Sequence, residues 1–288
     1  MLYLDAAATR LALPMADAVE AMVHAFTGEA ETPLRTLVGR SLVMPGRLDD
    51  HMAVKVVSVV PGNPAGVVAV FDGDGRPVGI VDGPTLTAIR TGAVCGLATR
   101  LLAPEAADTL AMLGAGAMAF DQVDAIRTVR PLAKVLVWSR RLEHARALAD
   151  LVGGEAVEEA DLGVAQADVV SCATPAHAPL FTVAAVRPGT HVNAVGAFTP
   201  EMAEIPPDLL GDAFVVVDDR DAAAGEAGDL LQAGRTPDAT LGELLRGEVH
   251  PPPGMVTVFK SVGVAAQDVA AAQRALENAD RLGVGHKL

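Results

Sequence analysis

The sequence predicts an α/β protein with a Rossmann-type, doubly wound parallel sheet and a second, discontinuous α+β domain. Three observations support this fold class. Strand and helix patterns alternate after residue 107, a glycine-rich turn follows the first of these strands, and a long alanine-rich helix pattern closes the chain. We expect the Rossmann domain at residues 107–261 and the other domain at residues 1–106 and 262–288.

The first hundred residues are expected to form a helix, a β-meander and a second helix. Apolar side chains recur at helical spacing within residues 15–26. Residues 83–102 predict a long helix with a candidate break at Gly92, and Pro104 ends it. Valine-rich strands and intervening turn clusters are expected between them: strands at 37–44, 52–60, 67–71 and 77–81, turns at 61–64 (PGNP) and 72–75 (DGDG).

Strands and helices are expected to alternate in the remainder of the chain. The strands are predicted at residues 109–113, 134–138, 168–172, 190–195 and 213–217, and the helices at 117–130, 141–152 and 178–187. A short strand at 256–259 precedes a helix over 264–282. This last helix is expected to pack back on the first domain, which makes that domain discontinuous.

Residues 109–119 (TLAMLGAGAMA) carry the most informative motif. An apolar strand pattern ends at Gly114, and the GxGxxA sequence leads into an amphipathic helix. Gly114 allows a tight turn, Gly116 lets a pyrophosphate approach the backbone, and Ala119 allows the helix to pack closely on the strand. The helix N-terminus, with Ala117 and Met118, would direct amide groups at the phosphates. These flanks favour a dinucleotide site over a purely structural turn.

The residues after the second strand favour NADP over NAD. An NAD-specific Rossmann unit carries an acidic residue about 20 positions past the glycines, where it binds the ribose hydroxyls. This chain has Ser139, Arg140 and Arg141 there, with no carboxylate. Arginine matches phosphate geometry and keeps its charge, so the pair suits a 2′-phosphate. The alternative is that both arginines face water, which leaves NAD as a cofactor without its usual anchor.

Composition excludes several classes of function. The formal charge of −14 argues against a nucleic-acid partner, and no apolar run is long enough to span a membrane. The N-terminus lacks the pattern of a signal peptide, so we expect a cytoplasmic protein. Cys95 and Cys172 lie in apolar runs and are expected to be buried free thiols. The seven histidines show no metal-binding spacing, so no metal site is expected.

Several further stretches resemble the ornithine cyclodeaminase/μ-crystallin family, in register over nearly the whole chain. The resemblance implies a Rossmann domain, a discontinuous domain for substrate binding and dimerisation, and a homodimer. It also implies one of three activities: cyclodeamination of ornithine, dehydrogenation of alanine, or reduction of cyclic ketimines. The stretches are Lys55 with residues 61–64, and residues 86–93 (LTAIRTGA), 189–200 (GTHVNAVGAFTP) and 259–264 (FKSVGV).

The resemblance implies that Arg35, Lys55 and Arg90 bind the substrate carboxylate and amine. Chemistry agrees for two of them, because Lys55 lies in an apolar strand and Arg90 between apolar helix residues, where an unpaired cation is costly. Arg35 as a surface arginine and Lys55 as an edge-strand lysine are the alternatives. By the same resemblance, Val262 lies near the substrate, and the cofactor contacts are Thr91, Thr174, Val192, Asn193, Ala194, Val195, Met202 and Ser261.

Phe198 is the main departure from the ornithine cyclodeaminases, which carry an aspartate in this loop. Cyclodeamination needs a carboxylate that moves protons, and phenylalanine cannot do so. It can present an apolar wall to a flat ring. Two smaller departures are Met118, where the family has glutamine, and a short segment before Phe71, which leaves a family threonine or serine near the cofactor without a clear counterpart.

The leading hypothesis is therefore an NADPH-dependent ketimine reductase that forms L-proline from Δ1-pyrroline-2-carboxylate, and L-pipecolate from Δ1-piperideine-2-carboxylate. Arg35 and Arg90 would hold the carboxylate, and Lys55 would orient it and could donate the proton. A cyclodeaminase or alanine-dehydrogenase-like enzyme stays open if Glu201 or Glu204 supplies a carboxylate. A μ-crystallin-like protein that binds NADP or a small molecule is the third reading.

Overall fold

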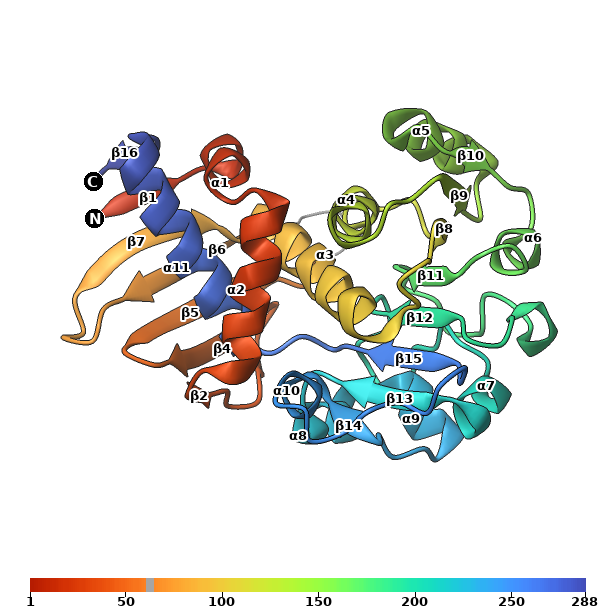
Figure 1. Cartoon of the computed structure of the whole chain (residues 1–288). Coiled ribbons are helices and arrows are strands. Elements are labelled where there is room, and N and C mark those ends of the chain that lie inside the picture. Colours follow the sequence, from red (N-terminus) through yellow and green to blue (C-terminus); the bar gives the residue numbers. More distant parts are fainter. Residues whose placement is uncertain (61–64) are drawn as a thin grey trace. The chain divides into compact units, whose positions relative to one another are not determined.

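The computed structural model describes residues 1–60 and 65–288, so the turn expected at 61–64 lies outside the described residues. The chain divides into two compact units, which the colours of Figure 1 help to follow. Unit 1 comprises Met1–Ala93 and Gly263–Leu288, and unit 2 comprises Val94–Val262. Each unit is built around its own sheet.

A mixed sheet forms the centre of unit 1, in the order β16-β1-β7-β6-β5-β4-β2, with β3 paired to β4. The meander β4 to β7 is antiparallel throughout, and β1 joins β7 in parallel. The strands are β1 (Leu2–Leu4), β2 (Ala30–Glu31), β3 (Thr36–Val38), β4 (Ser41–Leu48), β5 (His51–Ser58), β6 (Gly66–Phe71), β7 (Pro77–Asp82) and β16 (His286–Lys287).

Helices α1 (Ala6–Ala12), α2 (Met15–Thr27) and α11 (Ala265–Leu282) belong to the same unit. The C-terminal helix α11 packs on α2, β4 and β5, as expected from the sequence, and Figure 1 shows it crossing the sheet beside α2. Its close approach depends on Gly46, where an added Cβ would lie 2.6 Å from that of Ala265. On β5, Ala53 and Lys55 are buried while their neighbours are more exposed, so the lysine lies on the buried face.

Unit 1 differs from expectation in three places. The strand predicted at residues 37–44 is two strands, because Gly39 adopts a positive φ of 61° and turns the chain between β3 and β4. The helix α3 (Gly83–Leu102) runs through Gly92 without a break. The short elements β1, α1 and β16 were not predicted, although Asp5 caps α1 by accepting a hydrogen bond from the Ala8 amide at 2.8 Å.

Unit 2 contains the predicted parallel sheet, in the order β10-β9-β8-β11-β12-β15-β13-β14. Every pairing in it is parallel, and the order reverses on either side of β8, as in a doubly wound fold. The strands are β8 (Thr109–Leu113), β9 (Lys134–Trp138), β10 (Glu155–Ala156), β11 (Val169–Cys172), β12 (His191–Ala194), β13 (Phe214–Val217), β14 (Ala239–Thr240) and β15 (Thr257–Lys260).

The helices of unit 2 follow these strands. The first two pack as the sequence predicted, with Ala119, Val123 and Ile126 of α4 and Ala145 of α5 buried in one apolar cluster. The helices are α4 (Ala119–Val129), α5 (Leu142–Val152), α6 (Ala160–Val164), α7 (Pro207–Asp212), α8 (Arg220–Glu226), α9 (Gly228–Ala233) and α10 (Leu241–Leu245).

One expectation for unit 2 is corrected. Residues 178–187 form no α-helix but only the 3₁₀ turn η1 (Val183–Ala185), because the Leu180 amide donates to the distant carbonyl of Glu204. The acidic stretch after β13 is ordered. Asp218 is buried, and Asp219 caps α8 by accepting from the Ala222 amide at 2.8 Å.

The helix α3 passes from unit 1 into unit 2, so the unit boundary lies earlier than residue 106. Its second half packs within unit 2. A Cβ at Gly96 would lie 3.0 Å from the carbonyl oxygen of Ala125. The Asn193 amide also donates to the hydroxyl of Thr99 at 3.0 Å. These contacts explain why residues 94–102 cluster with the parallel sheet.

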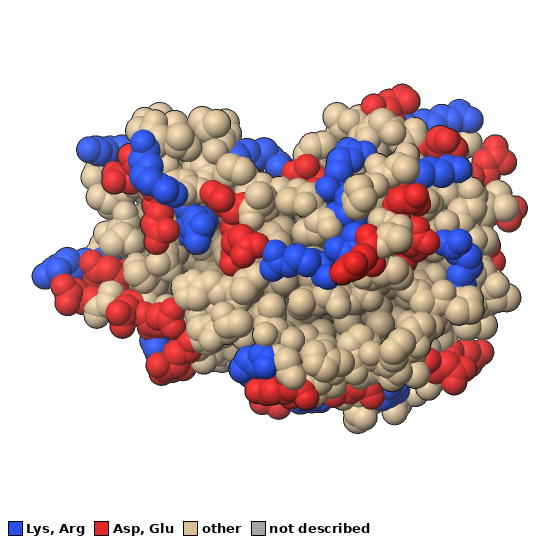
Figure 2. All heavy atoms as spheres, in the orientation of Figure 1, with Lys and Arg blue, Asp and Glu red and all other residues tan. Residues whose placement is uncertain are grey.

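Charged side chains of both signs are interspersed on the face that Figure 2 shows, without one extended basic patch. None of the helices in the described residues is long and apolar enough to cross a lipid bilayer.

Candidate functional site

The glycine turn after β8 has the geometry that its sequence predicted. Gly114 adopts a positive φ of 115°, and a Cβ there would lie 2.7 Å from the carbonyl oxygen of Ala173. Around Gly116, in contrast, a Cβ would meet no atom within 4 Å. Gly114 therefore satisfies a packing constraint, whereas Gly116 leaves open space in front of the backbone. This is the cradle that a pyrophosphate requires.

A cavity of about 570 Å³ opens at this turn. It brings together the predicted residues Gly114, Gly116, Ser139, Arg140 and Thr174 at the carboxyl ends of three neighbouring strands. The whole lining consists of Gly114, Ala115, Gly116, Trp138, Ser139, Arg140, His144, Ala173, Thr174, Pro175, Ala176, His177, Ala178, Pro179 and Leu180. His144, on α5, was not predicted as a contact, and residues 175–180 reach the cavity because of the path of the loop after β11.

The order of these residues fits a dinucleotide. Ser139 and Arg140 lie after β9, the glycine turn after β8, and Thr174 after β11. Dinucleotides bind across this edge of a doubly wound sheet with the pyrophosphate at the first glycine turn. A dinucleotide bound in this way would have its adenosine ribose at Ser139 and its nicotinamide on the Thr174 side. Arg141 precedes α5 as its N-cap, and its side chain is exposed.

The other predicted cofactor residues lie on several different elements. Met118 is the N-cap of α4 and follows Ala117. Met202 follows the Phe198 loop, and its amide donates to the carbonyl of Thr199 at 3.1 Å. Residues 192–195 are buried at β12 and its end, and Thr91 is buried on α3. The Ser261 hydroxyl donates to Asp218 at 2.7 Å, and the amide of Val262 donates to the same oxygen at 3.2 Å.

Unit 1 carries the predicted cations Lys55 and Arg90 in one buried cluster. Lys55 Nζ lies 2.7 Å from Oδ2 of Asp268, and Arg90 Nε donates to Oδ1 of the same carboxylate at 3.2 Å. Arg90 Nη1 also donates to the side-chain oxygen of Gln267 at 2.8 Å. Strand β5, helix α3 and helix α11 thus each supply part of the cluster.

Two cations face one carboxylate here, so the cluster keeps an excess positive charge. Burial lowers the pKa of Lys55 to about 8, Asp268 works against this change, and Arg90 and Arg35 add to it. Arg35 lies half-buried in the loop before β3, within electrostatic range of Lys55. An anionic ligand would balance the excess charge, which is what a carboxylate-binding site needs.

Sequence reasoning missed Gln267 and Asp268. Both are almost completely buried near the start of α11, a helix whose buried face otherwise consists of alanine, valine and Asn278. A carboxylate on the apolar face of a helix is costly unless it is paired, and this was the available signal. Gly263, which has a positive φ of 82°, leaves room for the cluster. A Cβ at this position would lie only 2.9 Å from Arg90 Nη1.

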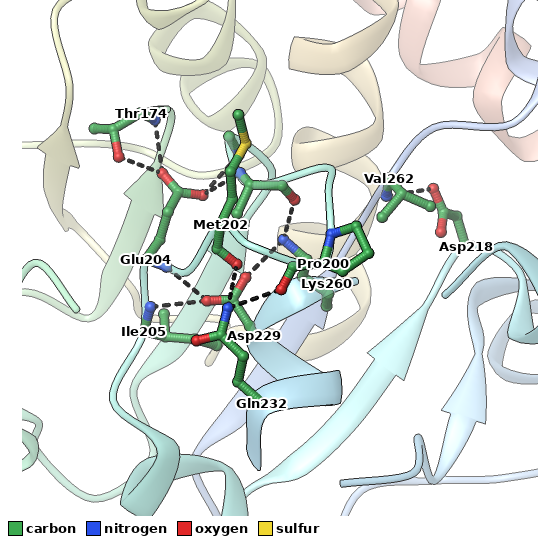
Figure 3. A network of polar contacts seen from close by, with 12 residues as sticks. Thr174, Pro200, Met202, Glu204, Ile205, Asp218, Asp229, Gln232, Lys260 and Val262 are labelled. Atoms are coloured by element: carbon green, nitrogen blue, oxygen red, sulfur yellow. Dashed lines mark hydrogen bonds and ion pairs between the residues drawn. The ribbon is translucent and has the colours of Figure 1, made fainter. Parts of the chain in front are cut away.

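Glu204 does not have the free carboxylate that a cyclodeaminase-like reading would need. Its oxygens accept hydrogen bonds from the amide and hydroxyl of Thr174 and from the amides of Gly196 and Ala197, as Figure 3 shows for Thr174. Glu201 is exposed on the Phe198 loop. The exposed fraction of Phe198 itself is 39%.

One histidine, His191, and both cysteines are fully buried. His191 is fully buried, and its nitrogens lie 2.9 Å from the Thr257 hydroxyl and 3.2 Å from the Asn193 oxygen. Burial lowers its pKa to about 3, so it is neutral at physiological pH. Cys95 and Cys172 are buried free thiols. Among the described residues, no group of three His, Cys, Asp or Glu side chains could hold a metal ion.

Comparison with known proteins assigns the chain to a family. The profile described as "Ornithine cyclodeaminase/mu-crystallin family" matches residues 8–282. The chain belongs to the ornithine cyclodeaminase/mu-crystallin family. Among its relatives is the ketimine reductase mu-crystallin of Mus musculus, with 35% identity over 267 residues, which covers 85% of this chain and 84% of the relative.

Other family members have similar sequences or structures. The Δ(1)-pyrroline-2-carboxylate reductase of Bacillus cereus (strain ATCC 10987) is 35% identical over 274 residues, covering 86% of this chain and 84% of the relative. The Thermococcus litoralis Δ(1)-pyrroline-2-carboxylate reductase, solved with NADH and L-proline, has a TM-score of 0.93 and 30% identity, and both chains are covered completely. An archaeal alanine dehydrogenase dimer with bound NAD has a TM-score of 0.92 and 27% identity, covering 100% of this chain and 98% of the other.

Proposed function

We propose that this protein is an NADPH-dependent ketimine reductase. It converts Δ1-pyrroline-2-carboxylate to L-proline and Δ1-piperideine-2-carboxylate to L-pipecolate. The observation that carries the proposal is the buried Lys55–Arg90 cluster with its excess positive charge, on a chain that also has a dinucleotide cradle. The names and activities of the two reductase relatives support the same substrate class.

The glycine turn and the cavity beside it would hold the nicotinamide cofactor, which would supply the hydride for the imine carbon, and the protein's own residues do the rest. Arg90 and Arg35 bind the ring carboxylate and fix the orientation of the ring. Lys55 delivers a proton to the imine nitrogen, directly or through water. Its lowered pKa, about 8, suits a proton donor at physiological pH, since a lysine with the ordinary value would hold its proton too strongly.

Phe198 favours reduction over cyclodeamination. A cyclic ketimine already contains its C=N bond and needs only a proton and a hydride, whereas ornithine needs a carboxylate that moves protons in several steps. Phe198 offers none, and the Glu204 carboxylate already accepts hydrogen bonds from three residues. The phenyl ring instead offers an apolar wall to the substrate ring.

Purified enzyme tests the reaction directly. We expect NADPH oxidation with either ketimine, with the cyclic amino acid as product, and no ammonia release from ornithine or lysine in the presence of NAD(P)⁺. Ammonia and proline from ornithine, without turnover of the ketimine, would instead assign the protein to the cyclodeaminases. Tight NADPH binding without turnover of any imine would assign it to the binding proteins.

The preference for NADP rests on the end of β9. Ser139 and Arg140 line the cavity, Arg141 follows, and no carboxylate is available there to bind ribose hydroxyls. The solved relatives named above contain NADH or NAD, so related folds accept the unphosphorylated cofactor. A comparison of kcat/KM for NADPH and NADH decides the preference, and equal values would overturn it.

A homodimer is the expected assembly. Several large apolar side chains of unit 1 are exposed, and a relative is described as a dimer. Light scattering should give twice the chain mass of 29.5 kDa, and a monomer at micromolar concentration would contradict it. These exposed side chains, from the strands and their adjoining loops, are Leu34, Leu37, Val38, Met52, Val59 and Val67.

A further inference from the structure

An ion cluster made of Glu204, Asp229 and Lys260 is buried in unit 2 (Figure 3). Lys260 Nζ lies 2.7 Å from Oδ2 of Asp229, and neither side chain is exposed. The other oxygen of Asp229 accepts hydrogen bonds from the amides of Glu204 at 2.6 Å and Ile205 at 3.0 Å. Two carboxylates and one ammonium leave the cluster with one net negative charge.

The hydrogen bonds around Glu204 favour its ionised form, because three of the four groups that donate to it are backbone amides, which cannot accept a hydrogen bond. The Thr174 amide and hydroxyl donate to Oε1 at 2.6 and 2.9 Å. The amides of Gly196 and Ala197 donate to Oε2 at 2.7 and 3.0 Å. A proton on Oε2 would point at two such amides. Burial raises the pKa of Glu204, while Lys260 and the Thr174 amide oppose that rise.

The cluster also joins two loops at the carboxyl edge of the sheet. Thr174 follows β11 and lines the cavity, and Gly196 and Ala197 follow the neighbouring strand β12. Lys260 donates to the carbonyl of Ala197, so the cluster binds both the backbone N–H and the backbone C=O of this residue. A Cβ at Gly196 would collide with the backbone of Thr174, which shows how tightly the loops meet.

The nicotinamide end of a dinucleotide falls at this edge. Ser139 lies at the opposite end of the cavity, and the glycine turn lies between them. An oxidised nicotinamide ring carries a positive charge, and the reduced ring carries none. A fixed negative charge in a dry environment therefore interacts with one oxidation state and not with the other.

We propose that the Glu204–Asp229–Lys260 cluster stabilises the oxidised nicotinamide relative to the reduced form and so favours hydride donation, an inference that rests on the proposed function. The cluster touches neither substrate nor hydride, and it acts as a positioning and electrostatic element. A cluster that only braced the loops would change the affinity for both oxidation states equally. The ratio of the dissociation constants for NADP⁺ and NADPH therefore distinguishes an electrostatic effect of the cluster from a purely structural one.

The variant Glu204→Gln removes the charge at nearly the same side-chain size, and its amide nitrogen also gives up the hydrogen bonds that one carboxylate oxygen accepts. We expect the ratio of Kd for NADP⁺ to Kd for NADPH, measured by calorimetry, to rise by about 10-fold. Asp229→Asn removes a charge without altering the Thr174 and Gly196 hydrogen bonds, so it should shift the ratio the same way and serves as a second test if Glu204→Gln fails to fold. Circular dichroism checks the fold of each variant.

Asp168→Asn is the matched control. Asp168 also accepts from two backbone amides, those of Asp108 and Thr109, but at the amino ends of the strands. Its loss should leave the ratio unchanged. A ratio within about 2-fold of the wild type in folded Glu204→Gln and Asp229→Asn would overturn the inference. Wild-type protein that binds neither NADP⁺ nor NADPH would instead overturn the proposed function.

Discussion

Nζ of Lys55 lies 2.7 Å from Oδ2 of Asp268, and only 2% of either side chain is exposed. The other oxygen of this carboxylate accepts a hydrogen bond from Arg90. Asp268 of the C-terminal helix α11 therefore positions both cations, one from β5 and one from α3. The geometry of the proposed acid-binding site depends on how α11 packs against its sheet.

Replacing Lys55 by methionine should lower kcat for ketimine reduction by about 100-fold or more, since a positioned proton donor contributes about 10²–10⁴-fold. Steady-state kinetics with purified variant would measure this. Lys287→Met, a change at an exposed lysine of the same unit, should have no effect. Near-wild-type kcat in Lys55→Met would show that the proton comes from another group.

The pH dependence of the reaction should report Lys55. Because its pKa is about 8, kcat/KM should fall as the pH rises through that value and the ammonium loses its proton. Asp268 raises this pKa, whereas Arg90 and Arg35 lower it. The variant Asp268→Asn should therefore move the alkaline limb to lower pH. An unchanged limb would mean that another group titrates.

Stability should depend on pH through the same residue. The unfolded lysine has the ordinary pKa of 10.5 and the folded one about 8, so between these values the unfolded state holds more protons. The unfolding free energy of the wild type should therefore rise with pH relative to Lys55→Met, by about 3 kcal/mol across this window. Urea titrations of both proteins at several pH values would measure the difference, and a constant difference would contradict the assigned pKa.

The double change Arg140→Ala with Arg141→Ala tests the cofactor preference. Hydrogen bonds to a charged group contribute about 1.5–3 kcal/mol, so kcat/KM for NADPH should fall by about 10–100-fold. The value for NADH should change little, because that cofactor has no 2′-phosphate. Arg146→Ala, at an exposed position on α5, is the control. Equal losses with both cofactors would indicate a structural role for the two arginines.

Local sequence was sufficient to predict those strands and helices whose apolar residues recur with a clear period. The alternation of β8 to β9 with α4 and α5 followed from apolar periodicity and from the glycine turn. Elements of two or three residues, such as β1 and β16, have no period to detect. The helix expected at 178–187 failed because the partner of its backbone, Glu204, is distant in sequence.

The same distinction applies to the site. Lys55 and Arg90 stood out as cations in apolar surroundings, and each proved to be buried. Their partner Asp268 was not identified, because a pairing across 178 residues leaves no local pattern. Buried carboxylates in otherwise apolar segments are the signal that such pairings leave.

Gly263 sets a boundary for redesign of the protein. Its missing side chain makes room for the guanidinium of Arg90, and its positive φ is one that other residues rarely adopt. Any larger residue would displace the arginine from Asp268 and Gln267 and so misalign the anion receptor. Efforts to widen the range of accepted acids should therefore change other residues around the anion receptor and leave this glycine in place. Its missing Cβ is what allows the Arg90 guanidinium to keep its orientation.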